Sequence, residues 1–105
     1  MESDQARFLR CIGEPTRLRI LKLLADGDKC VGEIADILNK EQSLISHHLR
    51  ALKDCNIVVA RQDAQKIYYK LVDPRLAVLV LTSESIMKEL PLCQIKGARG
   101  KGKED

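Results

Sequence analysis

The chain contains very few aromatic residues: two Tyr, one Phe and no Trp, only 3% of its 105 residues. A core without large rings must consist mainly of Leu, Ile, Val and Ala, which favours packed helices. The apolar residues, 45% of the chain, also form no run close to the roughly 18 that a membrane span requires. Residues 1–8 are polar and charged rather than typical of a secretory signal. We therefore expect a cytoplasmic protein that makes no membrane contact.

The sequence also lacks the usual signatures of a catalyst. It has no Gly-rich phosphate loop, no paired catalytic carboxylates, and no grouping of Ser, His and Asp or of Cys and His suited to nucleophilic catalysis. Its four cysteines are scattered and form no CxxC pair. We therefore expect a protein that is not an enzyme and whose thiols are reduced at rest.

Length and charge set broad limits on the fold and on the partner. A chain of 105 residues fits one domain, and so small a domain gains stability from forming an oligomer. The net charge of +3 and the pI near 8.7 permit a polyanionic partner without requiring one. We place one domain at residues 1–92 and expect the basic residues 93–105 to be disordered.

A helix-turn-helix is predicted near the middle of the chain. Residues 42–52 have apolar side chains at helical spacing, namely Leu44, Ile45, Leu49 and Leu52. The opposite side carries groups that hydrogen-bond to base edges or phosphates: Gln42, Ser43, Ser46, His47 and Arg50. A second short helix is expected at residues 31–38, joined to the first by residues 39–42. Two short helices with a tight joint, the second polar on its outer face, indicate a protein that binds double-stranded DNA.

A β-hairpin is predicted directly after this motif. Residues 57–61 and 66–72 are rich in β-branched and aromatic side chains, and polar residues separate the two runs. A two-stranded ribbon in this position is the wing of a winged helix. Its tip carries side chains that can reach a phosphate strand or the minor groove: Arg61, Gln62, Gln65 and Lys66.

Three further helices complete the expected fold, a mainly α winged helix-turn-helix of about five helices and a two-stranded wing. They are expected at residues 6–12, after a frayed segment 1–5, at residues 16–25, and at residues 75–90. In the helix at residues 31–38, the side chains expected to face the core are Ile34, Ile37 and Leu38.

The last helix is apolar on more than one face, which predicts that it buries a second surface. We expect that surface to form a homodimer, because a helix-turn-helix usually acts as a two-fold dimer on two half-sites. The alternative is that the whole helix packs on the core of its own subunit.

With these elements in place, the chain resembles the ArsR/SmtB family of small bacterial and archaeal repressors over roughly residues 6–92. Four stretches carry the likeness in the family's order and spacing, at residues 9–21, 30–35, 42–52 and 66–71. The resemblance implies a dimer built from the first and last helices, and a repressor that leaves its operator when an inducer binds. It also implies base and phosphate contacts by Gln42, Ser43, Ser46 and His47, with Arg61, Gln65 and Lys66 lying on the wing.

The chain departs from the family's pattern at three places. Ala64 stands where the wing often has Gly, and a positive φ there would strain Ala by roughly 1 kcal/mol or more. The family's thiolate pair "CVC" reads Cys30-Val31-Gly32 here, so the second ligand is missing. Residues 73–75 lack the His of the family's last-helix metal site, and no His follows them. A zinc, cobalt or nickel site of that type is therefore not expected.

The inducer site is predicted to use the cysteines. In a cadmium- and lead-sensing branch of the family, thiols at positions similar to Cys55 and Cys93 join across the dimer, although Ala51 replaces the expected helical partner of Cys55. A Cys11–Cys93 approach across the dimer is a second arrangement. Soft thiolates favour As(III), Cd(II), Pb(II), Cu(I) or Zn(II), and nearby thiols can form a disulfide under oxidation. We expect a thiol site that includes Cys93 and draws on Cys11, Cys30 or Cys55.

Other interpretations stay open for the protein as a whole. Cys11 and Cys30 can be small buried apolar residues, a common position for free Cys. The protein can then be a DNA binder without an inducer. It can also be a protein-interaction module, although the polar set at residues 42–50 lacks the aromatic side chains of a protein hot spot.

Individual side chains of the expected helix at residues 42–52 also have a second interpretation. His47 and His48 can both be solvated surface residues that touch nothing. Arg50 can pair with Glu41 or Asp54 instead of contacting DNA.

Overall fold

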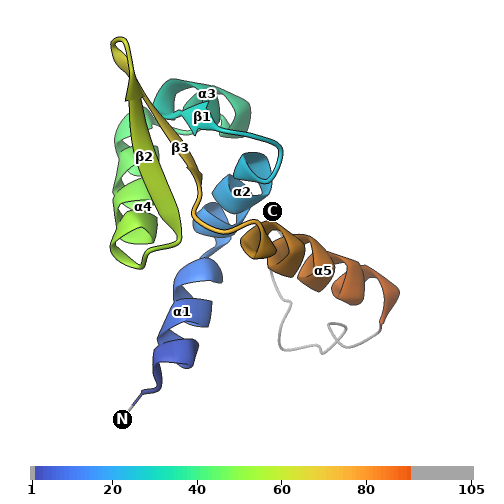
Figure 1. The fold of residues 1–105 in the computed structure, drawn as a ribbon. Helices are drawn as coiled ribbons and strands as arrows, with labels where there is room; N and C mark the ends of the chain where they lie inside the picture. Colours follow the sequence, from blue (N-terminus) through green and yellow to red (C-terminus); the bar gives the residue numbers. More distant parts are fainter. Residues whose placement is uncertain (1, 91–105) are drawn as a thin grey trace.

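The computed structural model describes residues 2–90 of the chain as five helices and three strands (Figure 1). In chain order these elements are α1 Asp4–Ile12, α2 Pro15–Leu24, β1 Lys29–Cys30, α3 Val31–Leu38, α4 Gln42–Asp54, β2 Val58–Asp63, β3 Lys66–Leu71 and α5 Arg75–Glu89. The predicted winged helix-turn-helix is confirmed, with α3 and α4 as the motif and β2 and β3 as the wing. Cys93 and the expected tail at residues 93–105 lie outside the described residues. Within residues 2–90, no helix combines the length and the apolar character needed to cross a membrane.

Helix α1 begins earlier than the apolar pattern predicts. The side-chain oxygen of Ser3 accepts a hydrogen bond from the backbone N–H of Ala6 at 3.0 Å and so caps the helix. Residues 4 and 5 are therefore helical, and the expectation that they are frayed is wrong. An N-cap depends on one polar side chain rather than on hydrophobic periodicity.

The sheet has a third strand that the sequence pattern did not indicate. Strand order is β1-β3-β2, all antiparallel, and Cys30 of β1 lies opposite Tyr68 of β3. Two residues are too few to show strand periodicity, which explains the omission. On the other edge, Asp63 pairs with Lys66 around a two-residue turn, where Ala64 has φ 60°. The wing turn therefore does place a non-Gly residue in the left-handed region.

The hydrophobic core is formed by all five helices together with the start of β2. Its fully buried side chains are Ile20, Leu21, Ile34, Ile45, Leu49, Leu52, Ile57, Val58 and Val80. The prediction that Ile37 and Leu44 face the core is wrong, because Ile37 is 55% exposed and Leu44 is 38% exposed. In α3 the small Ala35 is buried beside Ile34 and Leu38, whereas Ile37 lies on the outer side. In α4 Ile45 fills the inward position that Leu44 could also have taken.

Helices α1 and α5 project from the body at the end remote from the wing tip (Figure 1). Leu76 and Val80 attach α5 to the core, and Lys22 of α2 forms an ion pair with Glu84 of α5 at 3.2 Å. Six large apolar side chains of α5 and its C-cap stay exposed, and three of them lie on one side at spacings of seven and four residues: Leu79, Ile86 and the C-cap residue Leu90. We call these the α5 stripe. The whole of α5 therefore does not pack on the core of its own subunit.

Candidate nucleic-acid interface

One face of α4 is polar and exposed along its whole length. Ser43, Ser46, His47 and Arg50 lie at positions i, i+3, i+4 and i+7, and all four are exposed. The opposite face is buried and consists of Ile45, His48, Leu49 and Leu52. The 3.6-residue period therefore gathers two hydroxyls, an imidazole and a guanidinium into one stripe that points away from the core. We call these four residues the α4 stripe.

Gln42 lies at the edge of this stripe and faces the wing. Together with Gln65 and Lys66 it lines a groove of about 540 Å³ between the start of α3 and β3. Its side-chain nitrogen lies 3.7 Å from the position that a Cβ on Gly32 would occupy. The fold therefore brings three predicted DNA-contacting side chains from α4 and the wing to one groove. Glu33 of α3 also lines that groove, so its charge is mixed.

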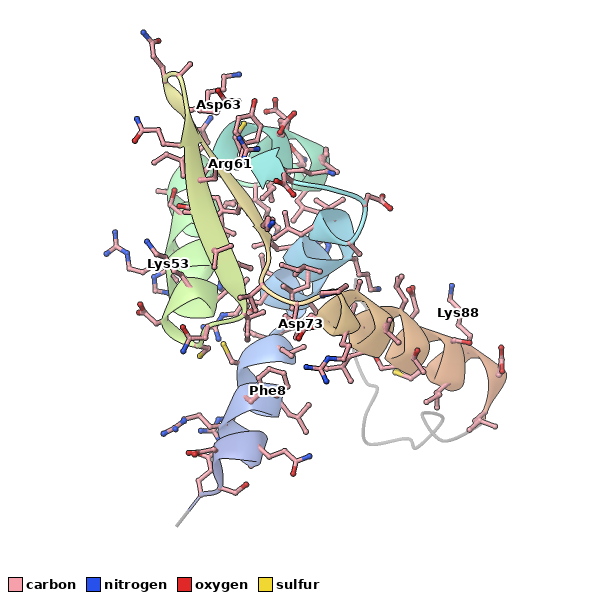
Figure 2. All side chains as sticks on the ribbon, viewed as in Figure 1. Phe8, Lys53, Arg61, Asp63, Asp73 and Lys88 are labelled. Atoms are coloured by element: carbon pink, nitrogen blue, oxygen red, sulfur yellow. The ribbon has the colours of Figure 1, made fainter. Side chains whose placement is uncertain are left out.

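Arg61 of the wing is held by neighbouring side chains. Its guanidinium lies 3.4 Å from Asp28 and 3.5 Å from Asp63, and 5.3 Å above the ring of Tyr68. Arg61 and Asp63 are both marked on the hairpin in Figure 2. Two carboxylates offset the charge of Arg61, so Lys66 is the more available cation of the wing.

His48 is buried, so the interpretation of it as a solvated surface residue is wrong. Its Nδ1 accepts a hydrogen bond from Nε of Arg17 at 3.3 Å and lies 3.8 Å from a carboxylate oxygen of Glu14. Burial, the largest cause, lowers the pKa of His48, and Glu14 partly opposes this. The ring is thus neutral at pH 7 and attaches the buried side of α4 to the first turn of α2.

His47 and Arg50 remain available on the outer face. The imidazole of His47 meets that of His48 edge to face, with ring centroids 5.4 Å apart. Among the ion pairs of residues 2–90, none joins Arg50 to Glu41 or Asp54, so the expected alternative pairing is not formed. Both side chains can therefore meet a ligand outside the protein.

The cysteines separate into two places. Cys30 is buried at the start of α3 and lines the groove beside the wing. Cys11, which is buried, and Cys55, which is half-buried, line a different cavity of about 210 Å³ at the ends of α1 and α4. Cys93 lies outside the described residues. Across residues 2–90 no three His, Cys, Asp or Glu side chains are grouped so as to hold a metal ion.

Sequence reasoning missed two features of this region. Glu14 and Arg17 position His48, and both lie within the stretch at residues 9–21 that carries the family likeness. Hydrophobic periodicity gives no signal for them. The approach of Cys11 to Cys55 depends on tertiary packing between α1 and α4, and no local pattern reveals it.

An exposed polar stripe on the second helix of a helix-turn-helix, followed by a β-hairpin, defines a winged-helix protein that binds DNA. Comparison with known proteins agrees: the profile described as "Bacterial regulatory protein, arsR family" matches residues 14–59. An HTH-type transcriptional regulator of Methanocaldococcus jannaschii is 46% identical over 76 residues, which cover 71% of this chain and 85% of that protein. The chain belongs to the ArsR/SmtB family of winged helix-turn-helix transcriptional repressors, and it is therefore a transcription regulator rather than an enzyme.

Two further proteins show the range of this similarity. The cadmium resistance transcriptional regulatory protein CadC homolog of Staphylococcus aureus is 33% identical over 78 residues, 73% of this chain and 64% of that protein. The chain thus spans slightly less than two thirds of that relative. The solution structure of a homodimeric winged helix-turn-helix DNA-binding domain from Mycobacterium bovis superposes with a TM-score of 0.75 and 26% identity, covering 93% of this chain and 87% of that one.

Proposed function

We propose that this protein is a cytoplasmic, homodimeric repressor that inserts α4 into the major groove of its operator and leaves the operator when an inducer reacts with its thiols. The α4 stripe is the observation that carries the DNA-binding part. A major groove admits one α-helix, and hydroxyl, imidazole and guanidinium groups recognise base edges and phosphates. Ser43, Ser46 and His47 supply base and phosphate contacts, and Arg50, the next residue of the stripe, contacts the sugar-phosphate backbone of the DNA.

The wing supplies contacts beside those of α4. Lys66 and Gln65 lie next to Gln42 in one groove, so a duplex that meets the start of α4 also meets the tip of the hairpin. Arg61 reaches a phosphate only by leaving Asp28 and Asp63, and it therefore contributes less than Lys66. This division predicts that the loss of Lys66 lowers the salt dependence of binding, by about one unit of slope.

The α5 stripe, together with Leu9 of α1, supports dimerisation through the first and last helices. These exposed apolar side chains belong to α1, α5 and the C-cap of α5, and both helices project at the end of the molecule remote from the wing tip. A two-fold dimer formed there presents two copies of α4 on one side, to half-sites about 10 base pairs apart or a multiple of that. The Mycobacterium bovis domain, which shares this fold, is described as homodimeric, and this supports the proposal of a dimer.

The cysteines support an inducer that reacts with thiols. Four cysteines in so small a chain, and a relative named for cadmium resistance, favour a soft metal or metalloid such as As(III), Cd(II), Pb(II) or Zn(II), or an oxidant. Cys93 is part of the proposed site together with Cys55, Cys11 or Cys30. The inducer acts by changing the angle between subunits, a coupling typically worth about 1–3 kcal/mol.

A gel-shift assay on the promoter of the protein's own gene tests the DNA contacts. His47→Ala removes one contact and should weaken binding by about 1–3 kcal/mol, or roughly 5- to 150-fold. Lys88→Ala is the control, because Lys88 is an exposed cation near the far end of α5, away from α4 (Figure 2). Equal affinity of both variants and the wild type would count against the assigned face of α4.

A salt titration and a series of cysteine variants distinguish the remaining possibilities: a protein-interaction module, a constitutive DNA binder and a repressor with a thiol inducer. Binding to duplex DNA should weaken steeply as salt increases, and a protein-interaction module would show no such binding. Each Cys→Ser variant is then titrated with As(III), Cd(II) and an oxidant. Release of wild-type protein, with loss of release in at least one variant, supports a thiol inducer site. If none of these reagents releases the protein from DNA, the protein is instead a repressor that binds constitutively.

A further inference from the structure

The cavity at the ends of α1 and α4 holds two thiols that are far apart in the sequence. The Cys11 thiol points at the carbonyl oxygen of Ala51, with Sγ and O 3.9 Å apart. The backbone N–H of Cys55 donates to the same oxygen at 3.1 Å. One carbonyl group therefore anchors both residues, and their side chains line the same cavity of about 210 Å³.

The surroundings of these thiols suit a redox pair better than a metal site. Across residues 2–90 no third Cys, His, Asp or Glu joins them to complete a ligand set. Three arginines line the cavity instead. Arg7 is paired with Asp4 and Arg10 with Glu2, whereas a guanidinium nitrogen of Arg17 lies 3.6 Å from Sγ of Cys11. Positive charge opposes a bound cation and stabilises a thiolate.

We propose that Cys11 and Cys55 form a reversible disulfide within one subunit, and that this disulfide weakens the binding of α4 to DNA. When the signal is an oxidant, this pair reacts without Cys93, which is then needed only for a bound metal or metalloid. The effect on DNA binding rests on the proposed function, whereas the disulfide itself does not. The oxidant belongs to the hydroperoxide class, and a small dithiol reverses the reaction.

The two cysteines have different roles in this reaction. Cys55 is half-buried and is reached first, whereas Cys11 is buried. Burial, with the neighbouring Cys55, raises the pKa of the Cys11 thiol to about 11, so Cys11 rests as a thiol. Arg17, whose guanidinium nitrogen lies 3.6 Å from Sγ of Cys11, favours the thiolate once its proton leaves.

The chemistry balances in two steps. The Cys55 thiolate attacks the peroxide oxygen, becomes a sulfenic acid and releases one molecule of alcohol or, from hydrogen peroxide, of water. The Cys11 sulfur then attacks the sulfenic sulfur, the S–S bond forms, and the oxygen leaves as water. Two thiols lose two hydrogens in total, and the peroxide accepts the two electrons.

The disulfide is connected to α4 by position and by Arg17. Cys55 directly follows the last turn of α4, while Cys11 lies in the last turn of α1. Arg17 bonds both to Sγ of Cys11 and to the ring of His48, which lies on the buried face of α4. Oxidation removes the thiol partner of Arg17 and draws α1 against the end of α4. The position of α4 would change, and so would the angle of α1, a helix that we propose to lie in the dimer interface.

Peptide mapping of the full-length protein after hydrogen peroxide treatment tests the bond. We expect a cross-linked peptide pair containing residues 11 and 55, lighter by two hydrogens, with the protein running as one subunit on a non-reducing gel. Cys30→Ser is the matched control because Cys30 is also buried but lines another cavity, and it should keep the cross-link, as should Cys93→Ser. Cross-links that involve Cys93, or covalent dimers, would overturn the proposal.

Operator binding of the same samples tests the consequence. Oxidised wild type, Cys30→Ser and Cys93→Ser should bind about 10- to 100-fold more weakly than when reduced, and dithiothreitol should restore binding. Cys55→Ser and Cys11→Ala should be insensitive to peroxide, and circular dichroism checks that each is folded. A mapped disulfide with unchanged affinity overturns the switch. Reduced protein that binds no duplex at low salt instead refutes the proposed function, whatever the mapping shows.

Discussion

The α5 stripe predicts how strongly one side chain supports the dimer. Ile86 is 43% exposed in the single subunit. Burying a whole Ile side chain contributes about 1.5–3 kcal/mol, so covering this exposed part contributes about 1 kcal/mol. Two-fold symmetry repeats the contact, which gives about 2 kcal/mol per dimer. Because each 1.4 kcal/mol is a factor of ten, Ile86→Ala should raise the dimer Kd about 30-fold.

Sedimentation equilibrium over a concentration series measures this constant directly. Ile37→Ala is the matched control, because Ile37 is 55% exposed but lies on α3 rather than α5. It should leave the Kd of the dimer unchanged. Thermal unfolding at concentrations where only single subunits are present should show similar stability for both variants. A Kd for Ile86→Ala equal to that of Ile37→Ala would refute the assignment of the α5 stripe to the dimer contact.

Three further perturbations test the fold that presents the α4 stripe. Leu49→Ala removes a fully buried side chain of α4 and should lower the free energy of unfolding by about 2–5 kcal/mol in urea titrations; a loss below 1 kcal/mol would contradict its place in the core. Ala64→Gly should raise that free energy by about 1 kcal/mol, because Ala64 has φ 60°; a decrease would show that the turn is unstrained. The lowered pKa of His48 means that the unfolded chain binds a proton more readily, so stability is retained above the ordinary value of 6.5 and is lost as pH falls below it. His48→Gln should show a flatter pH profile of the free energy of unfolding than the wild type between pH 7 and 5, and equal profiles for the two proteins would exclude this origin.

The sequence was sufficient to predict the order of the elements and the class of the protein. Apolar residues at helical spacing indicate α2, α3 and α4, and β-branched runs separated by polar residues indicate the hairpin. Each of these signals is local, because periodicity reports which face of a single element is buried. The α4 stripe could be predicted for the same reason, since Ser43, Ser46, His47 and Arg50 lie on one side of any helix that begins near residue 42.

Other features were decided only by the way the elements pack. His48 lies one position from His47, yet it is buried, because α2 covers that side of α4 and supplies Arg17 as a partner. Ile37 is exposed although its spacing matches a core position, and Ala35 is buried with Ile34 and Leu38 instead. Cys11 and Cys55 share a cavity only because α1 ends beside the last turn of α4. Distance along a chain carries no information about such contacts, whereas helical spacing reveals which side chains share a face.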